Sequence, residues 1–279
     1  MRVGVGLPTT TPGVGRDLLL EWAERADGGP FASVGLLDRI RYDSFEPFPV
    51  LGAAAAITRR VGLVTMIVIA PLRTTALLAK QAATVHALSG GRLTLGVSVG
   101  ARADDYEVTR VDYRTRGARL DDQLQDLRDL WEAGHVGPKQ ENPPKLLVGG
   151  LSGRAFARMA RYGDGYVHGG GPPRAFASAA AKALAAWTDM GRSGTPPLYG
   201  QGYFALGDQA ELDAGAAYLR DYYAFTGPFA EKIAAANLTT PQAIRDFIRE
   251  YDEAGCHELV LLPTVADLAQ LERLADVLA

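Results

Sequence analysis

Short apolar runs rich in β-branched residues alternate along this chain with segments of helical periodicity, and this alternation limits the folds open to it. In the helical segments apolar residues recur every three or four positions, as at Leu120, Leu124 and Leu127. The apolar runs, such as TMIVIA and ELVLL, are nearly continuous, which is typical of parallel strands buried on both faces. Eight strands are predicted, at residues 3–7, 33–37, 61–69, 92–99, 145–149, 165–168, 198–206 and 258–262.

Eight parallel strands joined by helices can close into a (β/α)8 barrel or lie open as a doubly wound sheet. The strand count favours closure, because an open sheet needs no particular number. Gly4 and Gly6 lie inside the first strand, and Thr9 stands where a dinucleotide-binding fingerprint needs a third glycine. We predict an α/β protein with one (β/α)8 TIM-barrel domain over residues 1–279 and insertions after strands 4 and 7, at residues 100–144 and 207–257.

Composition and charge exclude several classes of function. With 29 Lys and Arg against 32 Asp and Glu, the net charge of -3 gives no general attraction to nucleic acid or anionic membranes. The single Cys256 and four scattered histidines predict no metal site. The N-terminal residues lack a secretion-signal pattern, and the longest apolar run is too short to span a bilayer. We expect a cytoplasmic protein that acts on a small molecule, without nucleic-acid or membrane partners.

The segment after the fifth predicted strand carries the strongest signal of a site. The strand ends at Gly149 and Gly150, and a helix begins at Ser152 and Gly153, so backbone N–H groups converge at a positive helix end. Glycines let a ligand approach the backbone closely. From these residues alone two interpretations stay open: Ser152 only caps its helix, or it also binds a phosphate.

Asp38 and Arg39 follow the second predicted strand, at the expected mouth of the barrel. A carboxylate and a guanidinium there could hold a polar substrate or orient a cofactor ring. The alternative is a surface ion pair within the loop, with Arg41 or Asp43, which stabilises little.

Other residues near strand ends are less specific. Thr65 and Met66 lie inside the third predicted strand and by themselves indicate ordinary core residues. His168, at the end of the sixth, is the one histidine expected over the mouth, where it could act as a general base without a visible partner. Asp104 and Asp105, in the first insertion, could line a pocket.

Five stretches carry a family resemblance over nearly the whole chain. They are VGVGLPT (3–9), LLDRIRYDSFEPFPVLGAAAAIT (36–58), VIAPLRTTALLAKQAATVHALSGGRLTLGVSVG (68–100), RGARLDDQLQDLRDLW (116–131) and GGLSGRAFARMARYGDGY (149–166). With these stretches the chain resembles the bacterial-luciferase-like monooxygenase superfamily, which includes flavin-dependent monooxygenases and deazaflavin (coenzyme F420) dependent oxidoreductases.

The resemblance implies a barrel that holds a flavin or deazaflavin ring at its carboxyl end, with the cofactor phosphate at the helix after strand 5. The choice between FMN and coenzyme F420 stays open, and a homodimer is implied as possible. The resemblance also implies a bulge in strand 3 with a non-proline cis peptide at Thr65-Met66. Cofactor contacts are expected from Leu7, Thr65, Met66, Gly100, Gly149, Gly150, Leu151, Ser152, Gly153 and Gly169.

Two positions depart from relatives that dehydrogenate sugars or alcohols. Those relatives carry histidine after the strand 2 aspartate and glutamate just after strand 4, where this chain has Arg39 and Ala101. We therefore expect monooxygenation or reduction of a small organic substrate, with Asp38 and Arg39 as catalytic candidates and Arg39 holding an oxygen-derived anion or a substrate carboxylate. The alternatives are a flavin-binding protein without turnover and a non-redox phosphate-binding barrel enzyme.

Overall fold

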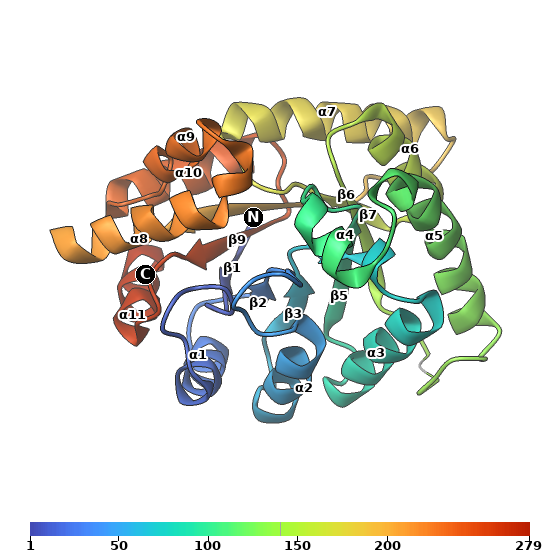
Figure 1. Cartoon of the computed structure of the whole chain (residues 1–279), viewed down its shortest axis with the longest axis horizontal. Coiled ribbons are helices and arrows are strands. Elements are labelled where there is room, and N and C mark those ends of the chain that lie inside the picture. Colours follow the sequence, from blue (N-terminus) through green and yellow to red (C-terminus); the bar gives the residue numbers. More distant parts are fainter. Residues whose placement is uncertain (140) are drawn as a thin grey trace.

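The computed structural model describes residues 1–139 and 141–279, and its parallel strands close into a barrel ringed by helices (Figure 1). The strand order is β3-β2-β1-β9-β8-β7-β6-β5-β4, and a further pairing of β3 with β5 closes the ring. The predicted (β/α)8 fold is confirmed, because β3 and β4 together form the third of eight barrel strands. The strands are β1 (Arg2–Gly6), β2 (Ser33–Leu36), β3 (Gly62–Thr65), β4 (Val68–Ile69), β5 (Leu93–Ser98), β6 (Lys145–Gly149), β7 (Gly165–Val167), β8 (Leu198–Phe204) and β9 (Glu258–Pro263).

Helices follow the strands in alternation and cover the outside of the barrel (Figure 1). Among the helices of residues 1–139 and 141–279, none combines the length and apolar character needed to cross a bilayer. The helices are α1 (Arg16–Gly28), α2 (Pro47–Ile57), η1 (Ala70–Leu72), α3 (Thr75–Leu88), α4 (Ala103–Thr109), η2 (Tyr113–Thr115), α5 (Arg116–Glu132), α6 (Gly153–Tyr162), α7 (Pro173–Asp189), α8 (Gln209–Tyr222), η3 (Ala224–Thr226), α9 (Phe229–Ala235), α10 (Pro241–Glu253) and α11 (Leu268–Leu278).

Two connections hold several helices each. α4, η2 and α5 lie between β5 and β6, and α8, η3, α9 and α10 lie between β8 and β9. These are the segments predicted as insertions, and residue 140 of the first lies outside the described residues. Both connections leave the carboxyl end of a strand, so their first residues lie at the end of the barrel where sites form in this fold.

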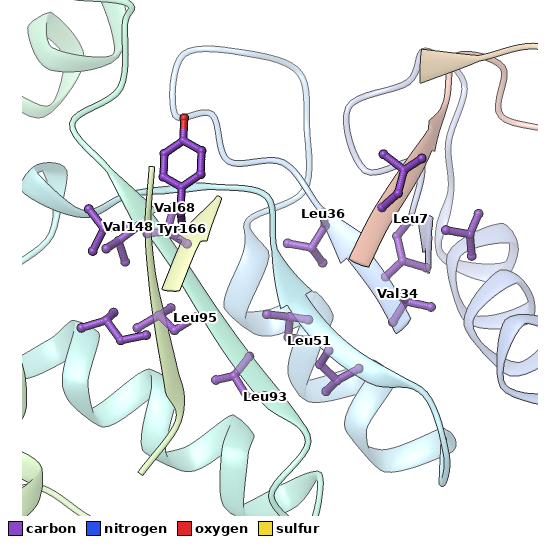
Figure 2. Close-up of a cluster of buried hydrophobic side chains, with 14 of the residues drawn as sticks. Leu7, Val34, Leu36, Leu51, Val68, Leu93, Leu95, Val148 and Tyr166 are labelled. Atoms are coloured by element: carbon purple, nitrogen blue, oxygen red, sulfur yellow. The ribbon is translucent and has the colours of Figure 1, made fainter. Parts of the chain in front are cut away.

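Side chains pack in two layers, one inside the barrel and one between the strands and the helices. Figure 2 shows part of the outer layer, including Leu7, Val34 and Leu36. The inner layer contains Val260 and Leu262 of β9, and these side chains pack where β1 and β2 present glycine. The GVG of the first strand therefore makes room for β9 inside the barrel.

The third barrel strand contains one residue more than its neighbour. Val64 of β3 lies opposite Thr94 of β5, whereas Val68 of β4 lies opposite Val97. Three residues therefore span one side and two span the other, which is the count of a β-bulge. The strand predicted as continuous over 61–69 is broken at this bulge.

Thr65 links the bulge to β5 through its side chain. Its Oγ1 accepts a hydrogen bond from the Gly96 N–H (2.7 Å) and donates one to the Gly96 carbonyl (2.8 Å). A side chain at residue 96 would collide with the Thr65 carbonyl, so the close approach requires glycine. The hydroxyl thus satisfies the two backbone groups that the bulge leaves without ladder partners.

The cis peptide bond joins Met66 and Ile67, so the position predicted from the family resemblance, Thr65-Met66, is wrong by one residue. The reason is the pairing with β2. Thr65 still lies opposite Leu36, and the Met66 N–H donates to the Leu36 carbonyl (2.7 Å). Regular strand geometry therefore continues through Thr65, and the chain departs from it only after Met66.

Replacement of Thr65 by valine tests the hydroxyl bridge. Thr65→Val leaves a buried N–H and a buried carbonyl without partners, and we expect the free energy of unfolding to fall by about 2–4 kcal/mol. Thr65→Ser keeps the hydroxyl and should lose only about 1 kcal/mol, the contribution of one buried methyl group. Denaturant unfolding followed by tryptophan fluorescence measures both, and equal losses would contradict the bridge.

Candidate functional site

Aromatic side chains cover one arc of the mouth, the end of the barrel where the strands reach their carboxyl ends. Tyr218 of α8 is bonded to Thr10, after β1, with 2.6 Å between the hydroxyl oxygens. The Tyr203 hydroxyl of β8 lies 2.8 Å from the Tyr223 hydroxyl. Burial raises the pKa of Tyr222 to about 12, so this phenol stays protonated at neutral pH. The first residues after β1 and the helices after β8 thus form a cover rich in neutral hydroxyls.

The opposite arc of the mouth carries the glycine turn, residues 149–153, which connects β6 to α6. The Ser152 hydroxyl accepts a hydrogen bond from the Ala155 N–H (3.2 Å), so Ser152 caps α6, and its binding of a phosphate stays a prediction. Gly150 has φ +132°, a conformation that favours glycine. A Cβ built on Gly153 would meet no heavy atom of the described chain within 4 Å. The turn therefore offers open space beside the unpaired N–H groups of a helix start.

A second turn, at residues 169–171, lies beside the first because β6 and β7 are neighbours. Gly169 is exposed, and a Cβ there would also meet no described atom within 4 Å. Side chains from other strands and helices fix both turns. The Tyr166 hydroxyl donates to the Gly150 carbonyl (2.9 Å), and the Tyr251 hydroxyl donates to the Gly171 carbonyl (2.9 Å). These bonds hold the backbone of both turns in place, while the positions of Gly153 and Gly169 stay unobstructed.

Asp38 is held in a buried ion pair. Its carboxylate accepts two hydrogen bonds from the Arg73 guanidinium (2.6 and 3.0 Å) and one from the Ile69 N–H (2.8 Å). Arg73 also donates to Glu46 (2.7 Å). Asp38 thereby ties the loop after β2 to the end of β4, and each of its oxygens already has a protein partner.

Arg39 turns away from Asp38 and binds the α4 helix. Its Nε donates to Asp105 (2.8 Å) and its Nη2 donates to Asp104 (3.0 Å). Asp105 is fully buried and also accepts from the N–H groups of Ile40 and Arg41 (2.9 and 2.7 Å). The ion-pair partners of Asp38 and Arg39 thus lie outside their own loop, where the alternative interpretation expected Arg41 or Asp43, and within the loop Arg39 donates only to the Arg41 carbonyl (3.0 Å).

The remaining predicted contact residues occupy different environments. Met66 is buried in the inner layer, and Gly100 lies at the end of β5 with φ +67°. Leu7 packs in the outer layer, so its side chain faces the helices (Figure 2). Leu151 is 68% exposed beside the glycine turn. The structure brings Met66, Gly100 and the two turns to one end of the barrel, and their contacts with a cofactor stay a prediction.

His168 does not face the mouth, which corrects its predicted position. Val167 packs in the inner layer, and side chains alternate along a strand, so the next residue points outward. The His168 ring lies edge-on to Phe176 of α7, with 5.8 Å between ring centroids, and neither ring nitrogen has a partner among the described residues. Burial lowers the pKa of His168 to about 4.

Gln201 is a candidate residue of the functional site that the sequence analysis did not predict. It lies on β8 in the same inward phase as Tyr199 and Tyr203, its Nε2 donates to the Gly169 carbonyl (3.0 Å), and its buried Oε1 has no partner among the described atoms. A polar side chain at an inward strand position is the signal that could have identified it. Other buried atoms without described partners also lie near this end, including Thr9 Oγ1, Ser44 Oγ and Arg102 Nε. Such atoms are expected where a ligand or water completes the structure.

On the part of the chain that the structure describes, surface hollows of about 190 and 370 Å³ lie elsewhere. The larger is lined by residues at the amino ends of β5 and β6, including Leu93 and Lys145. This is the end of the barrel opposite the glycine turn. The chemistry described above therefore identifies the mouth, and not the hollows, as the candidate site.

Comparisons with known proteins show which family and fold the chain shares. A family model described as luciferase-like monooxygenase matches residues 1–269. The uncharacterized protein Rv0940c of Mycobacterium tuberculosis is 34% identical over 142 residues, which are 46% of this chain and 49% of that protein. Pyrimidine monooxygenase RutA of Escherichia coli is 30% identical over 171 residues, 53% of this chain and 47% of RutA. The chain spans about half the length of the curated relatives it matches.

A solved structure extends the likeness to the whole fold. An F420-dependent secondary alcohol dehydrogenase in complex with an F420-acetone adduct superposes with a TM-score of 0.82, covering 99% of this chain and 97% of that chain. The sequences are 17% identical, so this likeness shows the shared fold.

Breaking the buried Asp38–Arg73 pair should destabilise the protein strongly. In Asp38→Asn, Arg73 loses a buried counter-ion, and we expect the free energy of unfolding to fall by about 3 kcal/mol. Glu46→Gln removes the other, half-exposed partner of the same arginine and should cost less than about 1 kcal/mol. Urea unfolding measures the free energy of unfolding of both variants. Similar losses in the two would show that burial does not determine how much the Asp38–Arg73 pair stabilises the protein.

Stability should depend on pH through His168. Between pH 6.5 and about 4 the unfolded chain binds a proton at this ring and the folded protein does not, so the free energy of unfolding falls as the pH falls. The full effect is about 3 kcal/mol. His168→Phe should remove this part of the pH dependence, whereas replacement of the exposed His135 by glutamine should retain it. Urea unfolding across that interval measures both, and an unchanged slope in His168→Phe would refute the assignment.

Proposed function

The chain belongs to the luciferase-like monooxygenase family, and we propose that it is an oxidoreductase that uses a reduced flavin or deazaflavin to oxygenate or reduce a small organic substrate. The main observation that supports this proposal is the glycine turn. A helix start with open space at Gly153 suits the phosphate that FMN and coenzyme F420 share. The turn lies at the same end of the barrel as the hydroxyl-rich cover, so a ring and a substrate would meet between them.

The residues of the two turns would hold the cofactor. The N–H groups of Ser152, Gly153 and Arg154, at the start of α6, would donate to its phosphate, with the Ser152 hydroxyl as a further donor. The ring would lie over the bulge of the third strand, near Met66 and Gly100. When bound, the reduced cofactor supplies the electrons for the reaction.

Asp38 and Arg39 support the site through the ion pairs that they make. Asp38 fixes the end of β4 through Ile69, and Arg39 fixes α4 through Asp105. In this role both residues orient the loops around the ring, and they need not touch a reacting atom. The aromatic cover would exclude water from the reduced cofactor.

Cofactor titration tests the proposed function. Oxidised and reduced FMN and coenzyme F420 are titrated into the protein by fluorescence or calorimetry, and at least one should bind. Absence of binding by both up to millimolar concentration would refute the proposal. A protein that binds the cofactor but never accelerates its consumption with a panel of organic substrates would support the alternative of a flavin-binding protein without turnover.

A negative charge in the glycine turn should weaken cofactor binding without harming the fold. Asp at residue 153 faces open space and interacts favourably with the start of α6, so Gly153→Asp should leave stability unchanged or raise it by up to about 1 kcal/mol. The same charge repels a phosphate, and we expect the dissociation constant to rise about tenfold or more. Gly15→Asp places the charge at the start of α1, where a Cβ is also unobstructed, and is the matched control. Equal affinity of the two variants would place the phosphate elsewhere.

A further inference from the structure

Among the described residues, three arginines lie largely buried at the mouth, and one of them has no carboxylate partner there. Arg39 and Arg73 each pair with two carboxylates. Arg102, the residue before α4, is 9% exposed, yet within the part of the chain that the structure describes no Asp or Glu forms an ion pair with it. A buried charge normally has a counter-ion, so the environment of Arg102 is incomplete.

The contacts of Arg102 use only part of its hydrogen-bonding capacity. Its Nη2 donates to the carbonyl of Tyr222 (2.7 Å), the last residue of α8, where the helix dipole partly offsets the positive charge. Its Nε is buried and has no partner among the described atoms. A guanidinium has five N–H donors, so a planar acceptor can still be accommodated.

An aromatic box, formed by Tyr222, Tyr223 and Phe225, surrounds this guanidinium. The Arg102 Cζ lies 4.2, 5.3 and 4.5 Å from the centroids of these three rings. Cation–π attraction holds the guanidinium in place without neutralising it. The box therefore fixes the orientation of Arg102 and leaves its charge available to an anion.

The aromatic box connects the barrel interior with the surface. Tyr223 is bonded to Tyr203, whose side chain belongs to the inner layer. Phe225 is 47% exposed and lies in η3, between α8 and α9. An anionic molecule that enters from solvent past Phe225 would meet Arg102 before it reaches the interior.

We propose that Arg102 receives the carboxylate of an anionic organic substrate, whose flat apolar part lies against Tyr223 and Phe225. The Nε edge of a guanidinium matches the two oxygens of a carboxylate. The proposal rests on the proposed function, because it assigns the substrate class of that site. It also transfers to Arg102 the carboxylate-binding role expected of Arg39, whose charge is already paired with Asp104 and Asp105.

The test uses benzoate as the probe and benzamide, its neutral analogue of the same shape, as the comparison. Both are titrated into the whole protein, with and without bound cofactor, by calorimetry. The Arg102 Nε–H signal is followed by ¹H–¹⁵N NMR and assigned by its loss in Arg102→Lys. We expect benzoate to bind at least about tenfold more tightly than benzamide and to shift this signal. Benzoate that does not bind, or that binds without moving the Arg102 signal, overturns the proposal.

Two variants test whether benzoate binding depends on Arg102 in particular. Arg102→Gln should weaken benzoate binding at least about tenfold. Arg192→Gln is the matched control, because Arg192 also stacks on an aromatic ring, Trp187 (3.7 Å), and donates to backbone carbonyls, but lies away from the mouth. Equal benzoate affinity in both variants overturns the proposal. If Arg102→Gln fails to fold, the NMR signal of the unsubstituted protein decides.

Failure of the proposal for Arg102 can be distinguished from failure of the proposed function. A protein that binds FMN or F420 but not benzoate contradicts only the assignment of Arg102. A protein that binds neither cofactor contradicts the proposed function, and the cofactor-free titration then decides on Arg102 alone.

Discussion

The barrel depends on complementary sizes of the side chains inside it. β1 and β2 present glycine to the interior, and Val260 and Leu262 of β9 fill the space that these glycines leave. Tyr199 and Tyr203 of β8 face the same interior. Protein interiors are close-packed, so a ring of strands closes only where large and small residues meet in this way. The positions of the strand ends, and thus of every loop around the mouth, follow from this packing.

The sequence predicts the eight barrel strands well because strands buried on both faces produce continuous apolar runs. Because these runs do not alternate between polar and apolar residues, they do not indicate which side chains point into the barrel and which point toward the helices. Leu7 and His168 lie at the expected strand ends but point toward the helices, and no alternation in the sequence reveals that direction. The resemblance places the cis peptide one residue too early, because the break in the strand is set by pairing of Thr65 with β2, a strand distant in sequence. The helix cap at Ser152, a purely local feature, was predictable.

The ion pairs at the mouth could not be predicted from the sequence, because each pair joins segments that are distant along the chain. Asp38 and Arg39 are neighbours in the chain, yet their ion-pair partners Arg73 and Asp105 lie on different elements. Adjacent residues leaving a strand point in different directions, so proximity in sequence says little about which charges meet. Because Arg39 and Arg73 are neutralised by such pairs, Arg102 is distinguished from them as a buried arginine without a carboxylate partner among the described residues.

The cover from α8 and η3 and the two glycine-lined turns occupy separate arcs of the mouth and share few residues. Hydrogen bonds of side chains attach α8 to other parts of the mouth, such as the bond between Tyr218 and Thr10 and the bond that Arg102 donates to the Tyr222 carbonyl. The turns, in contrast, are part of the continuous path of β6 and β7. Residues 209–226 can therefore diverge in evolution without disturbing the turn after β6, and a single scaffold of this kind can acquire new specificities by exchange of one segment.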